Sequence, residues 1–295
     1  MKAVARALAL LCLSVPLWAQ PNRPAITGVT QVSLKGSDLA QTRTFYGRGL
    51  GFVEAFQTGQ TTYFKVNDHQ YIDVTPGLKD DSEDRLTQVA FETADVRQMR
   101  DYLASNGVAV PAKVSPNAAG DLSVIVHDPE GRQIEFVEYS RGSLTSQNFG
   151  KSLASEAISQ RIIHCGFIVQ DRSAEDRFWK DILEFHEMWH GGGTDDRTDW
   201  VDMRVPEGMD WLEYMLNQPH PSTRTRGVMN HLALGVPSAD KAFEILSARG
   251  AAVKDKPKIG RDGKWQLNLY DPDLTRVELM EPDPVQKPCC SEFVK

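Results

Sequence analysis

Apolar and polar positions alternate along this chain in short runs that predict β-strands. The first group begins with a strand at residues 29–34, followed by an amphipathic helix at residues 39–48 that Ser37 or Asp38 can cap. Three further strands follow, at residues 52–56, 61–66 and 70–75. The first group therefore predicts one βαβββ unit.

The same order of elements then restarts three times. Each restart opens with a strand, continues with a helix that ends near a glycine or a polar turn, and closes with strands. The later helices are predicted at residues 95–106, 174–183 and 239–249, and later strands include residues 108–114, 161–169, 211–216, 252–257 and 276–280. Four βαβββ units in one chain indicate an internal repeat.

Comparison of the two halves places specific residues in register. At an offset of 133, Phe45-Tyr46 overlays Phe178-Trp179, and Gln31 overlays His164. At an offset of 143, the turn Asp128-Pro129 overlays Asp271-Pro272, Glu135 overlays Glu278, and Gln88 overlays His231. We therefore predict an α+β fold in which four βαβββ units pair into two domains of one type. The expected domains span residues 26–140 and 161–282, with a partly helical connection at 141–160 and a disordered tail at 283–295.

The amino terminus has a different composition. Lys2 and Arg6 precede the apolar run of residues 7–17, and Ala19 follows it. This pattern predicts a secretory signal peptide over residues 1–19, and hence a secreted or periplasmic protein in a bacterium. The apolar run is too short for a permanent membrane anchor, and no other stretch is apolar enough to span a bilayer.

Charge and cysteine content restrict the kinds of partner. The chain has 295 residues, a formal net charge of −7 and no basic cluster, which argues against a nucleic-acid surface. Removal of the signal leaves Cys165, Cys289 and Cys290, an odd number that does not suggest a disulfide framework. Cys289 and Cys290, in the expected tail, are candidates for incidental metal binding or for pairing between chains.

Polar residues recur at equivalent strand positions in the second half. Because side chains alternate across a strand, His164, Glu213, His231 and Glu278 each point away from the apolar side of their strand. If the units pair, these four reach one concave face. A lone histidine or glutamate on a strand is usually hydrogen-bonded or solvated. Four such residues at equivalent places favour a divalent metal site, and this donor set accepts Fe, Mn, Ni, Co or Zn.

The equivalent places in the first half carry different chemistry. They hold Gln31, Asp73, Gln88 and Glu135. Amides are weaker donors to such metals than imidazoles. We interpret the first domain as degenerate and supporting, and a second, weak metal site is the alternative.

The four βαβββ units, the aromatic helix ends and the Asp-Pro turn seven residues before a strand glutamate together resemble the vicinal oxygen chelate superfamily. This superfamily includes glyoxalase I, extradiol dioxygenases and antibiotic resistance proteins. The resemblance covers residues 26–282. It implies two glyoxalase-like domains and a metal whose open positions chelate adjacent oxygens of a small-molecule substrate.

The order His164, Glu213, His231, Glu278 resembles bacterial-type glyoxalase I. This resemblance implies a lyase or isomerase acting on a small hydroxy-carbonyl compound, with Glu278 and Glu213 as the catalytic bases. An exported protein, however, would not meet the cytosolic glutathione that glyoxalase I uses.

A second pattern leaves Glu213 out of the ligand set. The remaining triad of His164, His231 and Glu278 then resembles that of the extradiol dioxygenases, which activate O2 at Fe(II). Those enzymes carry a tyrosine where this chain has Asn268, and a histidine further upstream that is missing between His231 and Glu278. A third hypothesis is a metal-free protein that binds a small molecule such as an antibiotic. Monomer and homodimer both stay open, because a four-unit chain can complete its sites internally.

Overall fold

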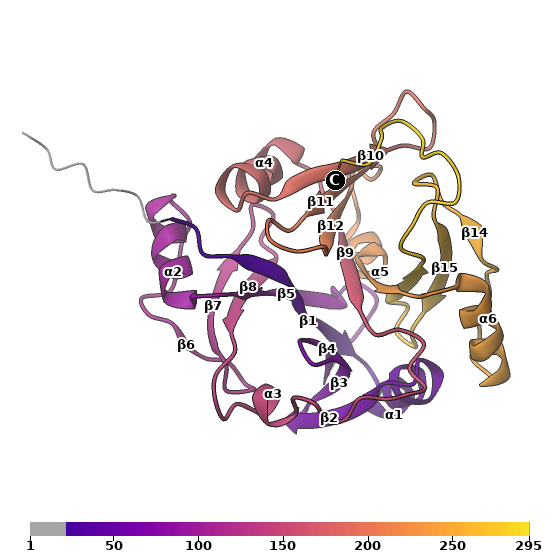
Figure 1. Ribbon diagram of the computed structural model, residues 1–295, viewed down its shortest axis with the longest axis horizontal. Helices are drawn as coiled ribbons and strands as arrows, with labels where there is room; N and C mark the ends of the chain where they lie inside the picture. Colours follow the sequence, from indigo (N-terminus) through magenta and orange to yellow (C-terminus); the bar gives the residue numbers. More distant parts are fainter. Residues whose placement is uncertain (1–21, 295) are drawn as a thin grey trace, which may run out of the picture.

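The structure is a computed structural model that describes residues 22–294. The predicted signal peptide, residues 1–19, lies outside the described residues. Two eight-stranded sheets dominate the molecule, one for each half of the chain (Figure 1). Their strand orders are β2-β3-β4-β1-β5-β8-β7-β6 and β10-β11-β12-β9-β13-β16-β15-β14. The second order repeats the first with every label raised by eight, so the predicted α+β fold of four paired βαβββ units is confirmed.

The strands are mostly five to eight residues long. In the first sheet they are β1 (Ile26–Gly36), β2 (Val53–Thr58), β3 (Thr61–Asn67), β4 (Gln70–Pro76), β5 (Leu86–Thr93), β6 (Ser115–Pro116), β7 (Leu122–His127) and β8 (Gln133–Glu138). In the second sheet they are β9 (Ile162–Ile168), β10 (His186–Gly191), β11 (Trp200–Arg204), β12 (Trp211–Met215), β13 (His231–Gly235), β14 (Lys258–Ile259), β15 (Trp265–Tyr270) and β16 (Arg276–Met280).

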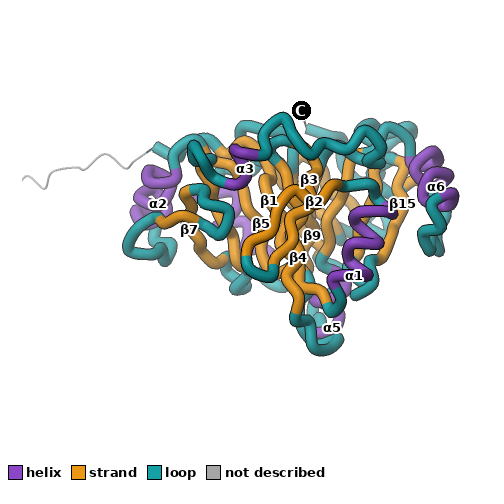
Figure 2. Tube along the Cα trace, turned by 90° about the horizontal axis from the view of Figure 1, so that it is seen from below, coloured by secondary structure: helices purple, strands orange, loops and turns teal. Residues whose placement is uncertain are grey.

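Short helices connect these strands. They are α1 (Leu39–Thr42), η1 (Arg43–Gly49), α2 (Val96–Ser105), α3 (Leu144–Gln147), α4 (Arg172–Asp176), η2 (Arg177–Ile182), α5 (Thr223–Met229) and α6 (Ala239–Ala248). Viewed from below, strands fill the middle of the molecule, with α2 at one end and α6 at the other (Figure 2). Among residues 22–294, every helix is too short or too polar to cross a membrane.

Sequence patterns located the four main helices and most strands, and the differences have physical causes. Asp38 caps α1 as expected, with its side chain accepting from the Ala40 N–H. The strands predicted at residues 108–114 and 252–257 are absent. Each range contains a proline, Pro111 or Pro257, which has no N–H for the strand ladder. Two-residue strands, β6 and β14, pair in these regions instead.

The two domains share one continuous core. The Phe91 ring of β5 lies 5.7 Å from the ring of Trp179 and 5.5 Å from that of Phe185, both in the second half. Polar contacts follow the same pseudo-symmetry. The Tyr46 hydroxyl donates to Asp271 across the interface at 3.1 Å, and Arg132 contacts Glu175 at 2.8 Å. In each case a helix of one domain meets the region of the Asp-Pro turn of the other.

The end of the chain is ordered, where we expected a disordered tail. Residues 283–294, here called the C-terminal strap, run back across the second sheet, so the C-terminus lies beside β10 (Figure 1). The Val285 N–H donates to the Gly263 carbonyl at 2.8 Å, and the Val294 N–H donates to the Met188 carbonyl at 2.8 Å. Backbone pairing and the partly buried Phe293 side chain account for this order, and neither was apparent in the pattern of the sequence.

Candidate metal centre

Two neighbouring rows of side chains cross the second sheet on its concave face. Strand register places Asp202, Glu213, Gly166, His231 and Arg276 beside one another in the first row. The second row holds Trp211, His164, Ala233, Glu278 and Asn268. Each row combines residues from five strands. The sheet therefore brings the four predicted site residues, His164, Glu213, His231 and Glu278, onto one surface.

Three of these four side chains converge on one point. The Nε2 atoms of His164 and His231 lie 3.0 Å apart, and the Glu278 Oε2 atom lies 3.5 Å from each. All three residues are buried, and they form the one group of this kind in a buried position within the described residues. Two imidazole nitrogens and one carboxylate oxygen are a donor set that divalent transition metals accept. These residues therefore fit one divalent metal ion.

Glu213 lies beside this group. Its Oε2 atom is 3.2 Å from His231 Nε2 and 3.9 Å from the guanidinium of Arg276. The ligand atoms of His164, His231 and Glu278 all lie within 4.8 Å of one another, and Glu213 is not part of this group. Arg276 also approaches both ring nitrogens of His231, at 2.6 and 2.9 Å. Glu213 therefore has a cationic neighbour that the sequence patterns did not identify.

Burial and hydrogen bonding have opposite effects on the pKa values of His164 and Glu278. Burial lowers the pKa of His164, which favours the neutral imidazole that binds metals. Burial alone would raise the pKa of Glu278. Hydrogen bonds from His164 and His231 outweigh it and hold the Glu278 pKa well below its usual value. The site therefore presents neutral imidazole and ionised carboxylate donors together.

Gly166 makes room for the imidazole of His231. A Cβ atom at this position would lie 2.8 Å from His231 Nε2, and closer still to Cε1 and Nδ1 of the same ring. Real Cβ contacts essentially never fall below 3.0 Å. Any larger residue here would displace the ring from its position opposite His164.

A cavity of about 280 Å³ opens onto the donor group. Its wall combines rings, acids and cations: Trp189, Trp200, Asp202, Asp262, Lys258, Arg261 and Asn268 are among the lining residues. The carboxyl of Asp202 is buried beside Glu213, and both burial and that charge raise its pKa well above the usual value. Sequence patterns missed Trp189, Asp202 and Arg276, although each follows from strand register once β9 to β16 are aligned.

Both halves of the chain match the model of one protein family. The glyoxalase/bleomycin resistance protein/dioxygenase superfamily matches residues 28–136 and 161–279, which together make up most of the chain. The chain belongs to this superfamily. The two matched ranges coincide with the two sheets, so each half of the chain is one copy of the superfamily's domain. A search of curated proteins found no match.

Solved structures of this superfamily share the fold at low sequence identity. Homoprotocatechuate 2,3-dioxygenase from Brevibacterium fuscum, solved with 3,4-dihydroxyphenylacetate, has a TM-score of 0.67 at 18% identity, covering 95% of this chain and 88% of its own. The 2,3-dioxygenase LapB from Pseudomonas sp. KL28 gives 0.67 at 15%, with 90% and 97% covered. A Mn(II)-bound glyoxalase from Novosphingobium aromaticivorans gives 0.68 at 17%, with 88% and 83% covered. These likenesses establish the shared architecture.

The first superfamily domain carries hydrogen-bonded amides and carboxyls in the matching rows. Register places Asp73 and Gln88 on either side of Ser33, as Glu213 and His231 flank Gly166. Ser33 donates to Asp73 at 2.8 Å, and the Gln88 amide donates to Glu135 at 2.7 Å. A side chain therefore occupies the place that Gly166 leaves open in the second domain. Our interpretation of the first domain as degenerate stays a prediction.

Proposed function

We propose that the chain is a metal-dependent oxygenase that holds one Fe(II) ion and cleaves a catechol-like ring next to its hydroxyls. The observation that carries this proposal is the donor group itself. His164, His231 and Glu278 converge without Glu213, and two histidines with one carboxylate are the ligand set of non-haem Fe(II) oxygenases. The dioxygenases that share its fold add support, as does the family match.

Bound Fe(II) would supply oxygen activation and the chelation of two adjacent substrate oxygens. In the overall reaction, one ring carbon–carbon bond breaks and both atoms of O2 enter the product, so no external reductant is needed. The chain's own residues would orient the ring and manage one proton. Glu213 is held ionised, since hydrogen bonding from His231 outweighs the effect of burial on its pKa. We assign to Glu213 the acceptance of the proton from a substrate hydroxyl.

Arg276 and Asn268 complete this assignment. The Arg276 guanidinium lines the cavity beside Glu213, and its charge would stabilise an ionised substrate oxygen. The Asn268 Oδ1 atom is buried without a hydrogen-bond partner, in the position where extradiol dioxygenases carry a tyrosine. It would accept a hydrogen bond from the substrate. A cavity of about 280 Å³ lies near the lower end of small-molecule sites, which favours a single substituted ring.

A specific distance favours a second candidate, a glyoxalase I-type lyase or isomerase. The Glu213 Oε2 atom lies 3.2 Å from His231 Nε2, slightly nearer than Glu278. A small rotation would make Glu213 a fourth ligand, with Glu278 and Glu213 as bases toward a carbon next to a carbonyl. The proposed export of the protein from the cytosol weighs against hemithioacetals of glutathione as its substrates.

Oxygen uptake separates these functions. The purified protein would be loaded anaerobically with Fe(II) and mixed with air-saturated catechols, while an oxygen electrode and the absorbance of the ring-opened product are followed. We expect equal consumption of O2 and catechol, which His231→Ala abolishes. No oxygen uptake, together with conversion of a hemithioacetal or 2-hydroxyketone, would favour the lyase. If neither class reacts and a ligand binds without metal, the chain is a binding protein.

A further inference from the structure

The C-terminal strap reaches the wall of the metal centre. Phe293 packs into a small apolar cluster with Trp211, Met188 and Met280. The Lys264 ammonium group is buried between two rings, 4.9 Å from the centre of Trp211 and 4.7 Å from that of Phe293. The Trp211 ring in turn lies 4.8 Å from the ring of His164. The position of the strap is therefore linked through packed rings to a residue of the donor group.

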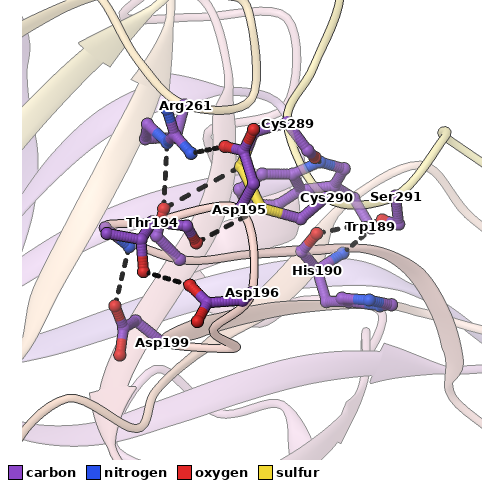
Figure 3. The surroundings of a disulfide bond; sticks show 12 residues. Trp189, His190, Thr194, Asp195, Asp196, Asp199, Arg261, Cys289, Cys290 and Ser291 are labelled. Carbon is purple, nitrogen blue, oxygen red and sulfur yellow. Dashed lines mark hydrogen bonds and ion pairs between the residues drawn. A yellow bond between two sulfur atoms is a disulfide. The ribbon is translucent and has the colours of Figure 1, made fainter.

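Two cysteines of the strap meet a loop of the second domain. Cys289 and Cys290 form a disulfide between adjacent residues, and each sulfur faces a loop carbonyl at 3.8 Å, that of Gly192 or Thr194. Asp195 projects from the same loop toward the sulfurs (Figure 3). The three side chains each have a ligand atom within 4.8 Å of the others. A disulfide between neighbouring residues cannot itself cross-link the strap to this loop.

We propose that the reduced cysteines, together with Asp195, form a second metal site for a thiophilic divalent ion such as Zn²⁺. Two electrons and two protons from an external dithiol, which leaves as its own disulfide, convert the Cys289–Cys290 bond into two thiols. Metal binding then releases the two thiol protons and leaves two thiolate ligands. Thiolates are soft ligands that select such ions over Mg²⁺ or Ca²⁺.

Charge and location both suit this ion. Two thiolates and one carboxylate carry three negative charges, and Arg261, which pairs with Asp195, supplies one positive charge. A divalent ion therefore neutralises the site. Asp195 is exposed, with 83% of its side chain accessible, so water can occupy a fourth ligand position. Such an ion would join the strap to the loop, a connection that the disulfide does not make.

The state of the cysteine pair would thus decide how firmly the strap is held. With the ion bound, the strap is fixed to the loop of residues 191–199 and to β10. Without the ion, the strap keeps its backbone hydrogen bonds, the hydrogen bonds between Ser291 and His190, and the contacts of Phe293. This site shares no residue with the donor group at His164, and its existence does not depend on the proposed oxygenase activity.

Titration with Cd²⁺ tests the site directly, because cadmium thiolates absorb in the ultraviolet. The oxidised full chain and the same chain reduced anaerobically with a phosphine would be titrated in parallel. We expect the reduced chain to bind one more equivalent than the oxidised chain, with a thiolate band. Zn²⁺ added in large excess should compete with Cd²⁺ for this site and reduce the thiolate band. Cys289→Ser/Cys290→Ser should remove the added equivalent, and Asp195→Asn should weaken it by at least about tenfold.

A matched control uses Asp196, the neighbouring acid, which bonds to Thr194 instead of facing the sulfurs. Asp196→Asn should bind Cd²⁺ as the unchanged chain does. Limited proteolysis supplies a second readout, since Zn²⁺ should slow cleavage of the strap in the reduced chain and leave the Cys289→Ser/Cys290→Ser variant unaffected. The proposal is overturned if the reduced and oxidised chains bind equal amounts of Cd²⁺, or if the cysteine variant keeps the added equivalent.

Discussion

Gly166 and His231 face each other across β9 and β13, and the imidazole fills the space above the glycine. A methyl group at residue 166 would lie 2.8 Å from His231 Nε2 and nearer to two other ring atoms. The ring cannot keep its position opposite His164 if a side chain is added there. The donor group therefore depends on a residue that binds no metal.

Gly166→Ala should weaken metal binding by about 10-fold to 100-fold. This is the range found when groups that orient metal ligands are lost. Competition with a chromophoric chelator would measure the change. Gly235→Ala, in β13 itself, is the matched control, because its methyl group meets the Ile163 side chain at 2.9 Å and the Arg161 carbonyl at 4.0 Å and no residue of the donor group. Equal affinities for both variants would contradict the role given to Gly166.

Glu213 separates the two candidate chemistries. If three residues bind the metal, Glu213→Gln should retain the metal at nearly unchanged affinity and lose turnover, because the amide cannot accept the substrate proton. If four residues bind it, as in the lyase hypothesis, the same variant should lose metal affinity. Metal content after gel filtration, measured beside oxygen uptake, distinguishes these results.

Asp73 should make the first domain less stable as the pH rises. Burial raises its pKa from the usual 3.8 to about 7. The folded chain therefore holds this proton more tightly than the unfolded chain, and the stability it contributes is lost as the pH rises from about 4 to about 7. The difference between a pKa of 3.8 and one of about 7 sets an upper bound on the order of 4 kcal/mol for the stability that is lost.

Asp73→Asn keeps a polar group beside Ser33 and removes the ionisation. Its free energy of unfolding should exceed that of the unchanged chain at pH 8, and the difference should shrink at pH 5. Urea denaturation at both pH values measures this difference. Asp101→Asn, at an exposed position, should show no such trend. A variant that is less stable at pH 8 than the unchanged chain would count against a raised pKa of Asp73.

Arg132 joins the two domains at a buried cluster of carboxyl groups. Its guanidinium contacts Asp128 within its own domain and Glu175 in the other, and also donates to the Ile168 carbonyl at 3.0 Å. Arg132→Ala leaves these carboxyls unpaired and should cost about 3–5 kcal/mol of stability. Arg224→Ala, which breaks an exposed pair with Asp81, should cost at most about 1 kcal/mol. Similar costs in denaturant unfolding would contradict a buried interdomain link.

The repeat made the fold and the site positions predictable. Residues such as Gln31 and His164 fall at equivalent strand positions, and strand alternation then orients His164, Glu213, His231 and Glu278 to one face. Strand register was not accessible from the pattern, because neighbours such as Gly166 and His231 lie far apart in the sequence. Arg276 was missed for the same reason.

Other features depend on contacts that no local pattern reports. The strap residues 283–294 are polar and rich in proline, which is typical of disorder. They are ordered by backbone hydrogen bonds to the second domain and by the contact of Phe293 with a cluster from distant strands. The helix α5 at Thr223–Met229 is not among the helices that the sequence patterns predict. Its Gly227 packs against the Glu83 carbonyl of the first domain, so tertiary contact supports a weak helix there.

The metal content of the purified chain tests the central claim most directly. The claim is that the second domain alone holds one divalent ion, through His164, His231 and Glu278. The protein would be kept with its Cys289–Cys290 disulfide intact, loaded anaerobically with Fe(II) and passed through gel filtration. Elemental analysis should then give one equivalent of iron for the unchanged chain and for Gln88→Ala, and close to none for His231→Ala. Two equivalents in the unchanged chain, or a full equivalent retained by His231→Ala, would contradict this account.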